Sequence, residues 1–87
     1  MNVPTTQQIR RFNRLFPLIP AELVKVVSLY AVGATQQEIA DLFSLSKNQV
    51  HKMLDSARRA LGLHSVQTIR IVVNNRLYFV ALDLLDF

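Results

Sequence analysis

The stretch that decides the fold runs from residue 35 to residue 62 and reads TQQEIADLFSLSKNQVHKMLDSARRALG. It contains two capping-box patterns, Thr35 with Glu38 and Ser46 with Gln49. In such a box, the hydroxyl accepts a bond from the backbone N–H three residues later, and the Glu or Gln side chain returns the bond. The two patterns therefore predict two helices that begin eleven residues apart.

The first of these helices has room only for residues 36–43, because the sequence Ser-Leu-Ser at 44–46 interrupts it before the second box. The second helix can continue to Leu61, where Gly62 supplies the left-handed residue that closes many helices. A short helix, a tight turn and a longer helix form the plan of DNA-binding helix-turn-helix units.

The longer helix has two contrasting faces. Its apolar residues follow the i, i+3, i+4, i+7 spacing of a buried stripe, from Val50 through Leu54 to Leu61. The opposite face is basic and rich in hydrogen-bonding groups, which makes it the candidate for binding a polyanion. This face carries Lys47, Asn48, His51, Lys52, Asp55, Arg58 and Arg59.

Two further helices are predicted before this unit. Within residues 1–16, Thr5 and Gln8 match another capping box, and prolines at 17 and 20 disfavour helix in the residues before them. The arginines at 10, 11 and 14 form either the solvated side of a packing helix or an added phosphate-binding arm. A second helix is predicted from Pro20 or Ala21 to Val32, with Gly33 as its end.

The C-terminal part of the chain is the least determined by its pattern. Ser65 can cap a further helix, and Asn74-Asn75-Arg76 interrupts its apolar pattern. Residues 75–87 are mostly apolar and fit helix or strand, with helix preferred. This tail either closes the monomer core or packs against a second copy. The candidate dimer contacts are Ile69, Val72, Val73, Leu77, Phe79, Val80 and Leu84.

Composition narrows the possible functions. The chain has 87 residues, a formal net charge of +4 and no cysteine, which favours one small domain with no disulfide or thiolate chemistry. Its carboxylates are scattered, and its two histidines, His51 and His64, lie thirteen residues apart with no cysteine or paired carboxylate nearby. We therefore expect no enzyme, no metal and no cofactor. The lack of a membrane-length apolar run predicts a cytoplasmic protein.

From about Ile19 to Arg70 the chain resembles the LuxR-type (GerE-type) helix-turn-helix of bacterial transcription regulators. The residues that carry the resemblance are Gly33, Thr35-Gln36-Gln37-Glu38-Ile39-Ala40, Leu45-Ser46, Val50, Leu54, Leu61-Gly62 and Ser65. The resemblance implies a four-helix domain whose third helix enters the major groove and whose fourth pairs with its twin. It also implies base contacts from Lys47, Asn48, His51 and Lys52, and phosphate contacts from Gln36, Gln37 and Gln49.

These observations together predict an all-α fold, a small helical bundle containing a helix-turn-helix. Residues 1–87 form a single domain, with an extra N-terminal helix in 1–16, a LuxR-like core in 19–74 and an apolar C-terminal extension in 75–87. The leading function is a transcription regulator that binds double-stranded DNA as a homodimer. The alternative is a protein-interaction module that holds another regulator or RNA polymerase. A third candidate is a fragment similar to region four of sigma factors.

Overall fold

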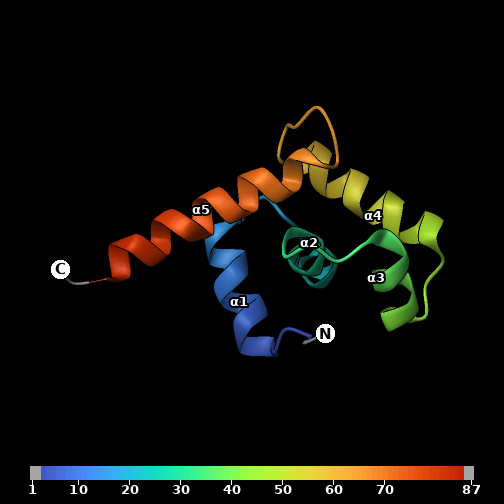
Figure 1. Cartoon of the computed structure of the whole chain (residues 1–87), viewed down its shortest axis with the longest axis horizontal. Helices are drawn as coiled ribbons and strands as arrows, with labels where there is room; N and C mark the ends of the chain where they lie inside the picture. The colour runs from blue at the N-terminus through green and yellow to red at the C-terminus, as the bar shows by residue number, and fades with distance from the viewer. Residues whose placement is uncertain (1–2, 86–87) are drawn as a thin grey trace.

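The computed structural model describes residues 3–85, which contain five α-helices, one short 3-10 helix and no β-strand. The all-α prediction is therefore confirmed. The helices pack as a small bundle that is extended along one axis by the last of them (Figure 1). In chain order the elements are α1 (Thr6–Leu15), η1 (Ala21–Leu23), α2 (Val24–Ala31), α3 (Gln36–Phe43), α4 (Lys47–Ala60) and α5 (Thr68–Leu84).

Capping boxes start three of the helices, as predicted. At α4, Ser46 Oγ accepts a hydrogen bond from Gln49 N at 3.0 Å, and Gln49 Oε1 accepts one from Ser46 N at 2.8 Å. The Thr35 and Glu38 pair makes the same two bonds at α3, and the box of Thr5 starts α1. Each cap satisfies N–H groups that have no partner inside the helix, a contribution of about 1 kcal/mol.

Three helices end with a residue in the left-handed region. Gly33 (φ +109°) follows α2 and Gly62 (φ +69°) follows α4, as the sequence predicts. Ser44 (φ +55°) ends α3, where it brings Leu45 N within 2.9 Å of Ala40 O. This left-handed serine makes the turn between α3 and α4 tight.

The start of the second helix differs from the prediction of one helix running from Pro20 or Ala21. Residues 21–23 form a 3-10 turn, in which Leu23 N bonds to Pro20 O at 2.9 Å, and the α-helix begins at Val24. Pro20 has no side-chain oxygen to cap the helix. The first turn therefore tightens into i to i+3 bonds.

The start of α5 also differs from the prediction. Ser65 Oγ lies 2.8 Å from the hydroxyl of Thr68 rather than capping a backbone N–H, and Thr68 N bonds to Ser65 O at 3.2 Å. The helix then continues without a break through Asn74-Asn75-Arg76 to Leu84. The tail is therefore helical, rather than a strand, as far as residue 84. Residues 1–2 and 86–87 lie outside the described range.

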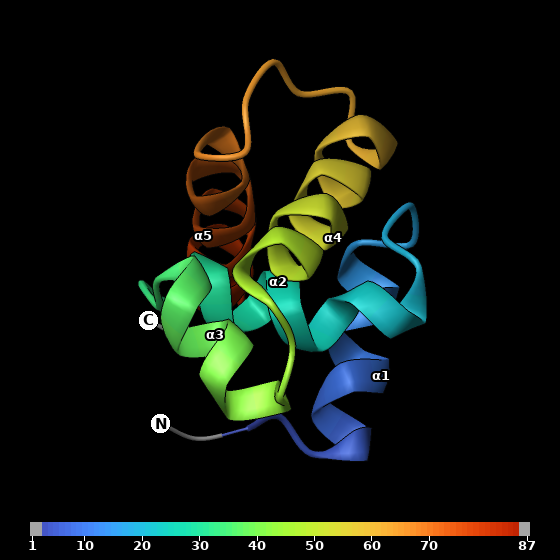
Figure 2. The ribbon, with the colours of Figure 1, turned by 90° about the vertical axis from the view of Figure 1, so that its right-hand side faces the viewer.

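The centre of the core is α2. Six of its eight residues are buried, and it contacts α1, α3, α4 and α5, which surround it (Figures 1 and 2). A helix that is apolar on nearly every side belongs in the interior. The buried residues of this segment are Leu23, Val24, Val26, Val27, Leu29, Tyr30 and Ala31.

Two side chains of α5 hold the end of α2 in place. Arg70 Nε donates to Tyr30 O at 2.8 Å, Arg70 Nη2 donates to Ala34 O at 3.0 Å, and the guanidinium lies 3.9 Å from the centre of the Tyr30 ring. Asn74 Nδ2 donates to Ala31 O at 2.8 Å. These bonds add side-chain donors to carbonyls at the end of α2 and in the segment after it, where Tyr30 O also accepts from Gly33 N at 3.1 Å. They also fix the segment that leads into α3.

Candidate nucleic-acid interface

The buried side of α4 sets which residues face outward. Val50, Leu54 and Ala57 are fully buried, and Met53 and Leu61 pack partly against the core. This is the stripe predicted from the sequence. On the exposed surface of the same helix lie Lys47, Asn48, His51 and Lys52. Figure 2 shows the side of the molecule on which α3 and α4 lie.

A shallow hollow gathers four of the predicted DNA-contacting residues. It is lined by Gln36 from the start of α3 and by Lys47, Asn48 and His51 from the first two turns of α4. Because the capping boxes fix the first turns of both helices, these side chains project from firmly placed backbone. The lining contains one permanent cation and amide and imidazole groups that can donate or accept hydrogen bonds, but no carboxylate.

A neighbouring hollow extends this surface toward α2 and α5. It shares Gln36 and Lys47 with the first and adds Gln37. It also includes Thr35, Gln67 and Arg70, which the sequence did not indicate as contact residues. No local pattern marks Gln67, because only the tertiary fold brings residue 67 to the same hollow as residue 36.

Two of the predicted phosphate-contacting glutamines already make internal bonds. Gln37 Nε2 donates to Asp41 Oδ1 at 2.9 Å, and Gln49 uses its Oε1 in the cap of α4. The amide nitrogen of Gln49 is the part of that side chain that remains for an outside acceptor. Thr35 N–H is similarly used by Glu38, and this backbone bond is the main reason that the pKa of Glu38 is lowered.

The far end of α4 is organised by an ion-pair cluster. Asp55 Oδ1 accepts from Arg58 Nε at 2.8 Å, and Asp55 Oδ2 accepts from Arg59 Nη2 at 2.6 Å. Arg58 Nη1 also donates to Leu63 O at 2.9 Å, which ties the loop after α4 to the helix. The side chains of Asp55 and Arg58 are only 27% and 25% exposed, whereas Arg59 is 68% exposed. Of the three predicted DNA contacts here, Arg59 is the one most open to a phosphate.

This cluster predicts a specific pH dependence of stability. Hydrogen bonds from Arg58 and then Arg59 lower the pKa of Asp55 from 3.8 to about 2. A carboxyl whose pKa is lower in the folded state stabilises the fold above its unfolded pKa, and this contribution is lost as the pH falls through the folded pKa. We therefore expect Asp55→Asn to lower the thermal midpoint at neutral pH. The difference in midpoint between the variant and wild type should disappear as the pH falls from about 4 to about 2.

The matched control is Asp41→Asn, which removes a carboxylate from the same helix-turn-helix without touching either arginine. Midpoints measured by circular dichroism across this pH range would contradict the assignment if Asp55→Asn stayed separated from wild type by the same amount down to pH 2.

The predicted dimer residues need one correction. Ile69 and Val73 are fully buried in the core, so they are not available for a second copy. They belong to the side of α5 that packs on α2, a helix that is apolar on nearly every side and is buried in part by α5. The remaining candidates are half-buried or exposed: Val72, Leu77 and Val80 are half-buried, and Phe79 and Leu84 are exposed. The sequence reasoning missed four exposed apolar residues of this region, Ile71, Tyr78, Leu82 and Leu85.

No helix within residues 3–85 has the length and apolar character needed to cross a membrane. In the same range, no three His, Asp or Glu side chains are grouped so that they could hold a metal ion. Comparison with known protein families, with curated proteins and with solved structures finds no match to this chain.

Proposed function

We propose that this chain is a DNA-binding transcription regulator that acts as a dimer in the cytoplasm, in line with its resemblance to LuxR-type helix-turn-helix domains. The observation that carries the proposal is the hollow formed by Gln36, Lys47, Asn48 and His51 at the first turns of α4. It joins both helices of a helix-turn-helix in one exposed surface of cationic and hydrogen-bonding groups.

In the proposed complex, the first turns of α4 lie in the major groove, which is wide enough to admit a helix. Asn48 would form a bidentate pair with adenine, and Lys47 and Lys52 would reach guanine or phosphate. The N–H groups at the start of α3, together with Gln36 and Gln37, would face the backbone, where the positive end of the helix dipole favours an anion. Arg59 would add a contact with a more distant phosphate.

A salt titration tests this proposal. Replacing Lys47 and Lys52 with Ala should remove two phosphate-neutralising charges and reduce the slope of log affinity against log salt by about 2. Fluorescence anisotropy with random and genomic duplexes provides the measurement. In the same titration, Asn48→Ala should relax sequence preference by about 1–3 kcal/mol without changing the slope.

The control for this titration is a Lys25/Arg76 double alanine variant, which makes the same change in net charge on α2 and α5. It should keep the wild-type slope, because both side chains are exposed on elements other than α3 and α4. Equal affinity of wild type and the Lys47/Lys52 variant for every duplex at low salt would refute the proposed DNA-binding function.

A different observation supports a second function. The exposed apolar side chains of α5, among them Tyr78, Phe79 and Leu84, form a surface suited to contact with protein. On this alternative, the scaffold holds another regulator or RNA polymerase rather than DNA. The same titration separates the two functions, because the alternative predicts no duplex binding that depends on Lys47 and Lys52.

A further inference from the structure

The C-terminal helix is apolar on two opposite sides. With 100° between successive residues, Ile69, Val73, Leu77, Val80 and Leu84 fall on one stripe. Ile71, Tyr78 and Leu82 fall on or close to the opposite side. The first stripe enters the core at Ile69 and Val73, packs partly against it at Leu77, and is 81% exposed by Leu84. The apolar stripe that covers the core at the start of α5 therefore continues along the helix past the point where the core ends.

This continuation has a visible cause in the arrangement of the helices. The last turns of α5 reach past α1, away from the end of the molecule that holds α3 and α4 (Figure 1). Their exposed apolar residues include Tyr78, Phe79, Leu82 and Leu84. Of these four, Leu84 lies on the stripe that continues from the core, whereas Tyr78 and Leu82 lie on the opposite side.

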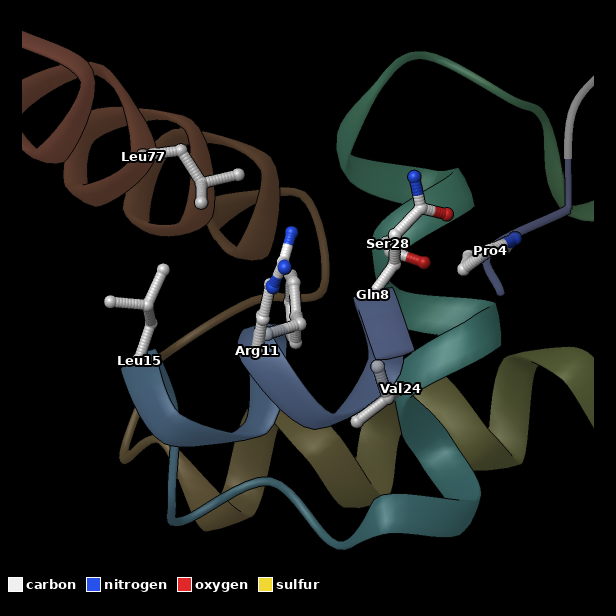
Figure 3. Close-up of a pocket in the computed structure, with 8 residues that line it drawn as sticks. Pro4, Gln8, Arg11, Leu15, Val24, Ser28 and Leu77 are labelled. Carbon is white, nitrogen blue, oxygen red and sulfur yellow. The ribbon is translucent and has the colours of Figure 1, made fainter. Parts of the chain in front are cut away.

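An apolar groove lies beside the same helix. It has a volume of about 420 Å³ and is lined mainly by apolar side chains of α1, α2 and α5, including Phe12, Leu15, Val24 and Leu77. Figure 3 shows Leu15 and Leu77 pointing into this space from α1 and α5, with Arg11 rising from α1 beside them. The groove offers walls on two sides, which suits an occupant that is apolar on more than one side.

We propose that the groove receives the C-terminal turns of α5 from a second copy of this chain, and that the exchange is reciprocal. The proposal rests on the proposed dimer and names its surface. Two antiparallel α5 helices that cross near Val80 place Leu84 of the partner subunit about 6 Å beyond the crossing, beside Leu77 and Leu15. A two-fold axis makes the second contact identical to the first.

Charge complementarity supports this occupant. Arg11 lines the groove, and Arg10 and Arg14 stand with it on the adjoining surface of α1. The incoming end carries Asp83, next to Leu84, together with the negative end of the helix dipole. In the reciprocal arrangement each Arg11 would meet Asp83 of the partner subunit, so both the apolar and the charged features of the helix end find a counterpart.

Sedimentation equilibrium without DNA tests the apolar part of the proposal. Wild type should be a dimer, and Leu84→Glu should weaken dimerisation by more than about tenfold, because it brings a carboxylate into an apolar groove. Ile71→Glu makes the same change at a 70% exposed residue on the opposite side of α5 and should remain dimeric. Leu84 is so exposed that its replacement should not affect folding, which circular dichroism would verify.

A charge exchange tests the pairing itself. Arg11→Glu and Asp83→Arg should each weaken self-association by about tenfold, because each homodimer then contains two like-charge contacts. Mixing the two variants should restore dimers at wild-type strength. The mixed dimer has one reversed pair and one native pair, so both of its contacts are favourable.

Four results would overturn the proposal. Three of them are a wild-type monomer at all concentrations tested, a Leu84→Glu variant that dimerises like wild type, and a mixture of the charge variants that stays as weak as its components. The fourth is loss of dimerisation in Ile71→Glu alone, which would assign pairing to the opposite side of α5. Because no DNA is present, these outcomes are independent of the duplex titration, so failure of DNA binding and failure of the groove pairing are distinguishable.

Discussion

Arg70→Met is expected to lower the free energy of unfolding by roughly 2–4 kcal/mol, because it removes two charge-assisted bonds to carbonyl oxygens and a cation–π contact. The guanidinium bonds to Tyr30 O and Ala34 O and stacks on the Tyr30 ring. Methionine keeps much of the volume of the stem and supplies no donor, so both carbonyls lose a partner. Urea unfolding followed by circular dichroism gives the measurement.

The same change should also affect the proposed DNA-binding surface. Arg70 lines the hollow that contains Gln36 and Lys47, and its bond to Ala34 fixes the residue before the cap of α3. We therefore expect weaker duplex binding even where the variant is fully folded.

The control for Arg70→Met is Arg76→Met on the same helix. The guanidinium of Arg76 lies 5.9 Å from the centre of the Phe16 ring, and the residue is exposed. Its replacement should cost less than about 1 kcal/mol. Equal costs at the two positions would show that Arg70 does not hold α2 to α5.

Leu54→Ala is expected to cost about 3–5 kcal/mol of unfolding free energy, because it leaves a cavity at a fully buried site in α4. Leu42→Ala changes a side chain of α3 that is 40% exposed, so it should cost much less unfolding free energy. The comparison matters for function, since the rotation of α4 that buries Leu54 turns Asn48 and Lys52 to the exposed side. A loss below about 1 kcal/mol at Leu54 would mean that another side of α4 is buried and that the candidate DNA surface is wrongly placed.

The helix starts and stops could be read from the sequence because their causes are local. The boxes of Thr5, Thr35 and Ser46 each join residues three apart, and Gly33 and Gly62 act through their own backbone conformation. The buried stripe of α4 was equally predictable, because a helix with known bounds has a fixed periodicity. For this reason the outward placement of Asn48 and Lys52 followed from sequence alone, whereas Lys47 lies on the side of Leu54 and is exposed as the first residue of α4.

Other features needed the tertiary structure, because they join residues far apart in the chain. Arg70 and Asn74 bond to carbonyls 36–43 residues away, and no local pattern indicates such partners. Ile69 and Val73 were predicted as dimer contacts, yet α2 requires both to complete its cover.

The helix α5 also shows what composition leaves open. Its tail fits helix or strand by propensity, and Asn74-Asn75-Arg76 looks like a break in the apolar pattern. In the fold, Asn74 bonds to the end of α2 and the helix continues to Leu84. The sequence by itself thus determined where α1, α3 and α4 begin and which side of α4 is exposed, since hydrogen bonds over three or four residues decide both. Only the tertiary structure decided which apolar residues of α5 belong to the core, because that depends on where the other helices end.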